Sequence, residues 1–285
     1  MNAPARLASF VATRFTPPVY AGYAILWALS FEAATSATPW RPTWLTLLRA
    51  VSVVFALLFL RMLDEQKDLA YDRLHNPARP LVTGDITFTD LRASMALLAV
   101  LGTVANLFVS VASALVYLGI FVYGLVLALA ERAFPRLADD PLPALLAAYP
   151  VQIVVSTYLL VSLGESFGWG FVAVLVAYAG SFLHFEFARK TRWSSDSDSR
   201  LYSVVLGPVR SASVAALCAV AAFGALLFIA LPHGFAAFSP LLVAIPATWG
   251  TVAFLRRRSD SWPTAPAMAV VLATHVSLIV GALRP

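Results

Sequence analysis

Three aspartates at four-residue intervals are the residues of this chain best suited to chemistry. Asp64, Asp68 and Asp72 directly follow a long apolar run. Because four residues turn an α-helix by about 400°, the three carboxylates are predicted to share one stripe of a helix. Carboxylates at the end of a membrane segment are costly without a positive partner. A divalent cation is the obvious partner, since Mg²⁺ usually binds one or two carboxylates plus the phosphates of a substrate.

Basic residues and a proline-bounded turn follow the aspartates. Arg73 and Arg79 come next in the chain, and Pro77, Pro80 and Gly84 restrict the shape of the turn around Arg79. A solvated loop between two helices is the simplest alternative for such a charge run. A loop that only had to be hydrated would not need two prolines and a glycine. Acids for a metal and bases for phosphate together predict a diphosphate site.

The elements that position these residues are predicted to be membrane helices. The chain has 285 residues, of which 60% are hydrophobic and 12% charged, and its mean hydropathy is +0.80, whereas soluble domains carry about 25% charged residues. Apolar runs near twenty residues recur along the whole length, as membrane spans require. We therefore expect an all-α membrane protein with about nine transmembrane helices around a central cavity, in a single domain over 1–285. The nine runs cover about 17–37, 44–63, 90–110, 112–131, 143–163, 168–187, 211–231, 239–255 and 263–283.

The basic residues predict the orientation of the chain. With the N-terminus inside, 17 of the 20 Lys and Arg residues fall on the inside, and only Arg41, Arg49 and Arg284 fall outside. Topology and anionic lipid thus explain the net charge of +5, and no nucleic-acid partner is expected. We expect a multi-pass integral protein of a bacterial-type inner membrane. The single cysteine, Cys218, lies in the seventh run and cannot form an intrachain disulfide.

Two of the predicted inside loops are long and charged. They cover about 64–88 and 186–210 and follow the second and sixth runs. Their separation is close to half the chain, which hints at a pseudo-repeat whose halves each donate one charged helix end to a common cavity. We therefore predict active-site loops on the cytoplasmic side.

The first loop resembles a family signature. Asp64, Asp68 and Asp72, followed by Arg79-Pro80 and then Gly84, are similar to the first signature of the UbiA-type intramembrane prenyltransferase superfamily, Asn/Asp-x-x-x-Asp-x-x-x-Asp before Arg-Pro and a Gly. The resemblance implies an enzyme that binds an isoprenyl diphosphate through Mg²⁺ and transfers the prenyl group to an aromatic or other acceptor. Some relatives instead cyclise the isoprenyl chain, so a terpene cyclase is the alternative.

The second loop departs from the family pattern. Members usually show Asp-x-x-x-Asp at the end of the sixth span, whereas this chain has Glu186-x-x-x-Lys190. This difference argues against a second Mg²⁺ held by two carboxylates. Lys190 is expected to stand in for it, because an ammonium also neutralises a leaving diphosphate. Asp196 and Asp198 could also approach, although an Asp-Ser-Asp-Ser stretch is typical of a flexible polar loop.

An allylic cation would also need dry surroundings with aromatic faces. The spans offer Tyr20, Tyr23, Trp27, Tyr117, Tyr123, Tyr149, Tyr158, Tyr178 and Phe182 for this role, although such aromatics are also ordinary packing residues. The polar residues in or near spans face a cavity or join helices, and they are Glu32, Asn106, Gln152, His184 and His275.

The resemblance assigns roles to individual residues of a Mg²⁺-dependent site. A transporter is a weaker alternative, because its carboxylates are expected near the midplane rather than at helix ends. The expected partners are an isoprenyl diphosphate, a hydrophobic or aromatic acceptor and the lipid bilayer. The expected metal ligands are Asp64, Asp68, Asp72 and Glu186, which with Lys190 form the catalytic set, and the expected substrate-binding residues are Lys67, Arg73, Arg79, Arg189, Tyr202, Gln152 and His184.

Overall fold

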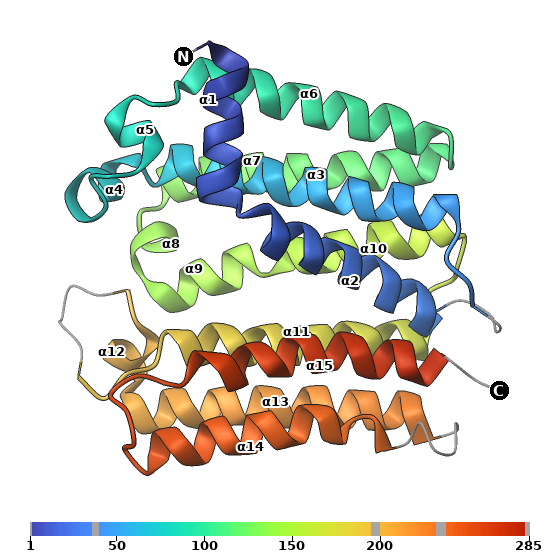
Figure 1. The fold of residues 1–285 in the computed structure, drawn as a ribbon, viewed down its shortest axis with the longest axis vertical. Helices are drawn as coiled ribbons and strands as arrows, with labels where there is room; N and C mark the ends of the chain where they lie inside the picture. Colours follow the sequence, from blue (N-terminus) through green and yellow to red (C-terminus); the bar gives the residue numbers. More distant parts are fainter. Residues whose placement is uncertain (1, 36–39, 195–199, 232–237, 283–285) are drawn as a thin grey trace. The chain divides into compact units, whose positions relative to one another are not determined.

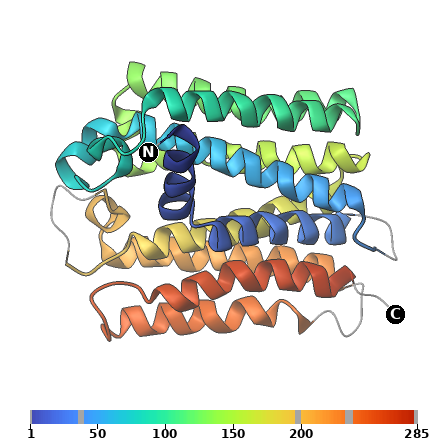
Figure 2. The same cartoon turned by 45° about the horizontal axis from the view of Figure 1, so that its top comes forward.

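The protein is built from helices that suit a membrane. A computed structural model describes residues 2–35, 40–194, 200–231 and 238–282. Within these ranges the chain forms helices and turns, with one isolated antiparallel bridge between Arg192 and Ser261 (Figures 1 and 2). Seven helices of the described chain are long and apolar enough to cross a membrane. The prediction of an all-α membrane protein is therefore confirmed.

Two of the nine predicted runs form helices outside these seven. The run at 17–37 forms Pro17–Thr35, and the run at 239–255 forms Leu241–Leu255, which has 15 residues and contains Pro246. The number of spans and the side on which the N-terminus lies stay predictions.

The chain divides into two compact units, and each unit gathers segments that are separate in the sequence. The first predicted motif belongs to one unit and the second predicted motif to the other. The first unit comprises residues 1–29, 42–133 and 153–164, and the second comprises 30–41, 134–152 and 165–285.

The first unit contains the long helices on both sides of the first motif. Within it, α1 runs across the ends of α3 and α6 rather than along them, in both views (Figures 1 and 2). Its elements are α1 (Ala3–Phe10), the π-helix η1 (Val11–Phe15), most of α2 (Pro17–Thr35), α3 (Trp44–Lys67), α4 (Leu69–His75), α5 (Pro80–Thr83), α6 (Phe88–Leu107), α7 (Val111–Ala133) and most of α10 (Pro150–Leu163).

A buried asparagine joins the helices of the first unit. The Asn106 amide on α6 donates to Ser52 Oγ on α3 at 3.0 Å, and its oxygen accepts from Tyr158 on α10 at 2.9 Å and from Ser113 on α7 at 3.2 Å. In a membrane such bonds hold helices together because lipid cannot satisfy the polar groups. Of the two roles open for Asn106, the structure shows the helix-joining one. Tyr117 and Tyr158 are likewise packed in this core, with ring centroids 5.0 Å apart.

Helix α3 ends inside the first motif, and two short helices form the turn that follows. Asp68 has φ −86° and ψ 3°, so it separates α3 from α4. Pro80 begins α5, and Gly84 ends it with φ +83°, a conformation that glycine adopts without the steric cost that other residues meet. The Ile86 N–H closes the turn on the Pro80 carbonyl at 3.2 Å. The predicted loop is thus an ordered pair of helical turns.

The second unit is organised around α11 and α13. A Cβ added at Gly180 would lie 2.5 Å from the Cys218 carbonyl oxygen and 2.7 Å from the Ala222 nitrogen, so the two helices approach closely only because this residue has no side chain. The elements of this unit are α8 (Arg136–Asp139), α9 (Pro141–Ala148), α11 (Trp169–Arg189), α12 (Tyr202–Leu206), α13 (Pro208–Ala230), α14 (Leu241–Leu255) and α15 (Thr264–Ala282).

A buried chain of polar side chains also ties the second unit together. Ser30 Oγ lies 2.7 Å from Tyr178 Oη on α11 and 2.7 Å from His275 Nδ1 on α15. All three residues are buried, and the Tyr178 and His275 rings pack together at 5.1 Å. His275 therefore links helices within the core of this unit.

Candidate functional site

The three predicted aspartates have unequal surroundings: Asp64 lies on α3, Asp68 lies between α3 and α4, and Asp72 lies on α4. The Asp68 N–H donates to the Asp64 carbonyl at 3.0 Å, and the Asp72 N–H donates to the Asp68 carbonyl at 2.9 Å. The helical spacing therefore continues through the break at Asp68. The Asp64 side chain is 46% exposed, whereas that of Asp72 is 2% exposed. The stripe thus runs from an accessible carboxylate to a buried one.

Asp72 is held by the turn that follows it. Arg79 Nη1 lies 2.7 Å from Asp72 Oδ2, and the Asn76 side-chain amide donates to Asp72 Oδ1 at 2.9 Å. The Arg79 N–H also donates to the Asn76 carbonyl at 3.1 Å, so the turn presents this arginine from a fixed backbone. The structure brings together Asp72 and Arg79, which the sequence assigned to the same site.

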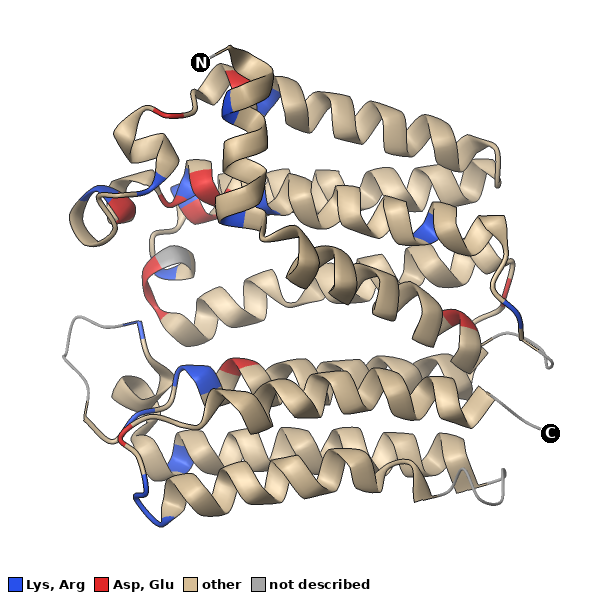
Figure 3. Ribbon diagram, in the orientation of Figure 1, with Lys and Arg blue, Asp and Glu red and all other residues tan. Residues whose placement is uncertain are grey.

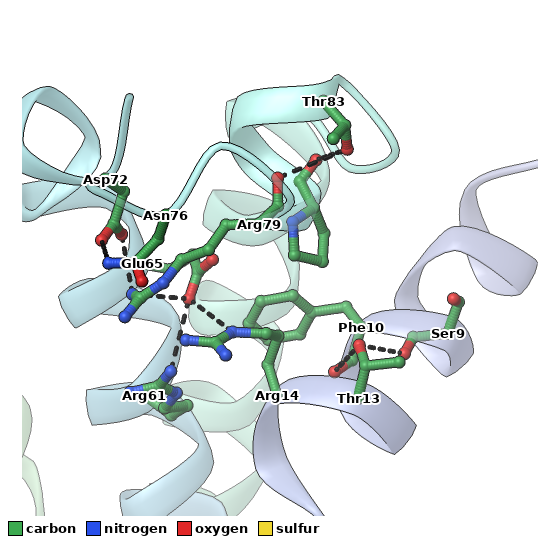
Figure 4. A network of polar contacts seen from close by, with 11 residues as sticks. Ser9, Phe10, Thr13, Arg14, Arg61, Glu65, Asp72, Asn76, Arg79 and Thr83 are labelled. Atoms are coloured by element: carbon green, nitrogen blue, oxygen red, sulfur yellow. Dashed lines mark hydrogen bonds and ion pairs between the residues drawn. The ribbon is translucent and has the colours of Figure 1, made fainter. Parts of the chain in front are cut away.

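A fourth carboxylate, Glu65, lies at the centre of the cluster and was missed in the sequence analysis. Its Oε2 lies 3.1 Å from Arg14 Nε, 3.5 Å from Arg61 Nη2 and 3.7 Å from Arg79 Nη1. Figure 4 shows the three guanidinium groups converging on this carboxylate, with Asp72 beside Arg79. Glu65 is buried, and its Oε1 has no hydrogen-bond partner among the described residues.

The spacing of Glu65 was a signal that could have revealed it. Seven residues separate it from Asp72, and seven residues turn a helix by about 700°, which is only 20° short of two full turns. Glu65 and Asp72 therefore share a face more closely than Asp64 and Asp72 do. The prediction followed the four-residue spacing of Asp64, Asp68 and Asp72 and therefore did not include Glu65.

The N-terminal segment contributes to this cluster through Arg14. This residue lies on η1, which ends at Thr16 with φ +44°, a left-handed conformation that is unusual for a β-branched residue. Upstream, Arg6 on α1 donates from Nε and Nη2 to Asp90 on α6 at 2.9 and 2.8 Å. Phe10, between these two attachments, is also buried. We call residues 6–14 the N-terminal strap, because this segment crosses the ends of α3 and α6. Arg14 was predicted only as one of the basic residues on the inside, because its partner is 51 residues away.

The other two basic residues predicted near the first motif differ in their contacts. Lys67 Nζ lies 3.2 Å from Asp64 Oδ1 and 3.0 Å from Glu131 on α7. Arg73 on α4 is exposed. We refer below to Arg14, Arg61, Asp64, Glu65, Lys67, Asp68, Asp72 and Arg79 as the α3 cluster.

The second predicted motif forms a separate cluster in the second unit. Glu186, near the end of α11, pairs with Lys190 Nζ at 2.8 Å and with Arg189 Nε at 2.5 Å. Tyr202 on α12 donates its hydroxyl to Glu186 Oε1 at 3.2 Å. Four residues assigned from the sequence therefore meet, and we call Glu186, Arg189, Lys190 and Tyr202 the α11 cluster. Figure 3 shows charged residues at the end of α3 and at the end of α11.

Gln152 and His184 are buried away from these contacts. The His184 Nδ1–H donates to the Ala215 carbonyl at 2.9 Å, and its ring packs edge-on against Trp262 at 5.7 Å. His184 Nε2 and Gln152 Oε1 are buried without a hydrogen-bond partner among the described residues. Their substrate-binding role stays a prediction. Asp196 and Asp198 lie outside the described residues.

The α3 cluster fits a metal ion that is shared with a phosphate. In the described part of the chain, no three His, Cys, Asp or Glu residues are grouped closely enough to hold a metal by themselves. Mg²⁺ does not need such a cage, because it keeps several waters and takes one or two carboxylates plus substrate phosphates. The buried, unpaired Glu65 Oε1 and the accessible Asp64 carboxylate are hard oxygen donors of this kind. The α3 cluster can therefore supply ligands to Mg²⁺.

Comparison with known structures defines the fold. A UbiA homologue from Archaeoglobus fulgidus bound to GPP and Mg²⁺ matches with a TM-score of 0.66 and 17% identity, over 94% of this chain and 96% of that one. An apo UbiA homologue from Aeropyrum pernix K1 gives 0.64 and 18%, over 92% and 97%. A digeranylgeranylglyceryl phosphate synthase gives 0.62 and 16%, over 96% and 99%. No family model and no curated protein matches the sequence. The chain is thus an all-α membrane protein with the fold of UbiA homologues.

Proposed function

We propose that this protein is a Mg²⁺-dependent intramembrane prenyltransferase that uses an isoprenyl diphosphate as donor. The observation that carries the proposal is the α3 cluster, in which Arg79 and Asp72 meet beside the buried carboxylate of Glu65. Acids for a metal and arginines for phosphate lie together at the end of one membrane helix. Support also comes from the fold, because the Archaeoglobus fulgidus homologue has been solved bound to DMAPP and Mg²⁺ and bound to GPP and Mg²⁺.

The α3 cluster places its arginines around its two buried carboxylates. Arg14 and Arg61 face Glu65, and Arg79 faces both Glu65 and Asp72. With four basic and four acidic residues the whole cluster is neutral, so a metal ion and a diphosphate would enter it together, and the planar guanidinium fork matches phosphate oxygens in pairs. Arg79 would bind the donor diphosphate. Arg14 and Arg61 would add positive charge beside it.

The aspartates would hold the metal on the open side of the cluster. Asp64, Asp68 and Asp72 are proposed as ligands, directly or through water, and Glu65 Oε1 as an additional acceptor. Bound Mg²⁺ would stabilise the negative charge on the leaving diphosphate. Asp72, which pairs with Arg79, would hold the metal beside the guanidinium that binds phosphate.

The reaction breaks the bond between the allylic carbon and the diphosphate oxygen, and the electron pair leaves with the diphosphate. The guanidinium groups stabilise that charge as it develops. A nucleophilic atom of the acceptor forms the new bond to the allylic carbon, and the proton that it loses passes to the released diphosphate. The surrounding apolar helices exclude water, which would otherwise capture the allylic cation.

A terpene cyclase shares the ionisation step and is the second candidate. The observation that keeps it open is the α11 cluster, which departs from the two-acid pattern through Lys190. A cyclase forms the new bond within the isoprenyl chain and needs no acceptor. Products formed with and without an aromatic acceptor separate the two reactions.

The test uses the purified full-length chain in lipid nanodiscs with isoprenyl diphosphates of graded length. We expect diphosphate release that requires Mg²⁺, together with a prenylated product when an aromatic acceptor is present. Asp64→Asn should abolish release, whereas Asp85→Asn should not, because Asp85 is an exposed aspartate of the same turn whose carboxylate accepts a hydrogen bond from the Thr83 hydroxyl. Release that continues in EDTA, or that survives Asp64→Asn, would refute the proposal.

A further inference from the structure

Both oxygens of the Glu186 carboxylate are engaged by its neighbours. Its Oε2 accepts from Arg189 Nε at 2.5 Å, and its Oε1 accepts from Lys190 Nζ at 2.8 Å and from the Tyr202 hydroxyl at 3.2 Å. The side chain is 7% exposed. Both oxygens of Glu186 face protein donors, whereas in the α3 cluster Glu65 Oε1 has no partner among the described residues and Asp64 is accessible.

The net charge of the α11 cluster also disfavours the binding of a cation. Two cationic side chains face one carboxylate, so the cluster has a net charge of one positive unit. The side chains of Arg189 and Lys190 are 46% and 27% exposed. An approaching ion therefore meets the cations first, and like charges repel most strongly near a membrane where screening is weak. The α11 cluster does not fit a second Mg²⁺.

The ammonium of Lys190 is held in place from several sides. It lies 5.0 Å from the centre of the Tyr202 ring, over its face, and that ring stacks on Phe187 at 4.4 Å. The Tyr202 N–H donates to the Lys190 carbonyl at 3.1 Å, which joins α12 to the end of α11. Burial and the charge of Glu186 raise the pKa of Tyr202, so its hydroxyl stays protonated and donates. Lys190 is therefore a fixed cation rather than a mobile surface lysine.

We propose that the α11 cluster is a metal-free anion site, in which Lys190 and Arg189 bind phosphate oxygens directly while Glu186 and Tyr202 position them. This inference rests on the proposed function for the identity of the anion as a diphosphate. It departs from the two-acid pattern implied by the family resemblance, because an ammonium of this chain replaces a metal ion. Glu186 is then a positioning residue for two cations.

The probe is inorganic diphosphate, and its binding to the full-length protein in nanodiscs is measured by calorimetry in EDTA. An Arg79→Ala background weakens the contribution of the α3 cluster. In that background, Lys190→Met should weaken binding by about 10- to 100-fold, which is the value of losing one charged hydrogen bond. Arg192→Gln is the matched control, because it removes an exposed cation two residues away and should leave binding unchanged.

A second measurement counts the metal. Mn²⁺ bound in the presence of inorganic diphosphate is counted by electron paramagnetic resonance, and Glu186→Gln should leave the number per chain unchanged. Lys190→Asp should add one Mn²⁺, because it creates a pair of acids with Glu186. Unchanged diphosphate affinity in Lys190→Met, or the loss of one Mn²⁺ in Glu186→Gln, would overturn the inference.

These results are distinguishable from a failure of the proposed function. If no isoprenyl diphosphate is turned over while Lys190-dependent binding persists in EDTA, the anion site stands and the prenyltransferase proposal fails. If turnover requires Mg²⁺ and Asp64 while Lys190→Met binds diphosphate normally, the prenyltransferase proposal stands and the anion site fails.

Discussion

Replacement of Arg79 by alanine separates its two possible tasks, which are holding Asp72 and holding the substrate. The side chain contributes a 2.7 Å ion pair to Asp72 Oδ2 and a 3.7 Å contact to Glu65 Oε2. After the change Asp72 keeps the 2.9 Å hydrogen bond from Asn76, and Glu65 keeps Arg14 and Arg61. The loss therefore falls mainly on Asp72, which is buried.

The expected cost in stability is moderate. Removal of one partner from a fully buried ion pair costs about 3–5 kcal/mol, because the other charge is left uncompensated. Arg79 is partly exposed, so water can reach its position in the variant and screen Asp72. We therefore expect a loss of about 1–3 kcal/mol, most of which comes from the isolated Asp72 carboxylate.

Arg79→Ala is also expected to lower the affinity for the diphosphate. One charged hydrogen bond contributes about 1.5–3 kcal/mol, and 1.4 kcal/mol is a factor of ten in affinity. Arg79→Ala should weaken binding of an isoprenyl diphosphate analogue about 10- to 100-fold. Arg79→Lys should recover only part of this loss, because lysine keeps the charge but lacks the planar fork.

The assay is a double-mutant cycle with Asp72→Asn, read out by thermal unfolding and by calorimetric binding of inorganic diphosphate in EDTA. Asp72→Asn removes the isolated charge, so the double variant should regain most of the stability lost in Arg79→Ala. Its diphosphate affinity in EDTA should stay low, because the arginine is still missing. If stability and affinity recover together, Arg79 is only a counterion of Asp72 and the phosphate assignment is wrong.

Three further outcomes are expected. Asp64→Ala and Asp68→Ala should each lower turnover at least about 100-fold in a radiolabelled-donor assay, because a metal ligand stabilises the transition state; near-normal turnover in both would contradict the metal assignment. Prenylated product should appear only when an aromatic acceptor is supplied, as judged by mass spectrometry, and a cyclic hydrocarbon formed without acceptor would favour the cyclase. Asn106→Leu should destabilise the first unit by about 2 kcal/mol in detergent unfolding, because three interhelical bonds contribute about 0.6 kcal/mol each; an unchanged transition would mean that these bonds contribute nothing.

The sequence by itself determined the class of protein and the place of the first cluster. Long apolar runs can bury their backbone polar groups only as helices in a membrane, so composition and run length predicted the all-α fold. The carboxylates at 64, 68 and 72 and the turn around Arg79 were predicted because helical spacing and proline act locally. The pairing of Glu186 with Lys190 also follows from a four-residue interval.

Only the tertiary structure decided which charges meet across long separations. Arg14 reaches Glu65 because the N-terminal strap crosses the end of α3, and no local rule connects residues 51 positions apart. The pairing of Lys67 with Glu131 and the joining role of Asn106 are likewise products of packing. Spacing fixes the direction in which a side chain leaves its own helix. The partner that it finds depends on which donor or acceptor atom of another helix is brought within about 3 Å, and that is settled by the burial of the whole chain.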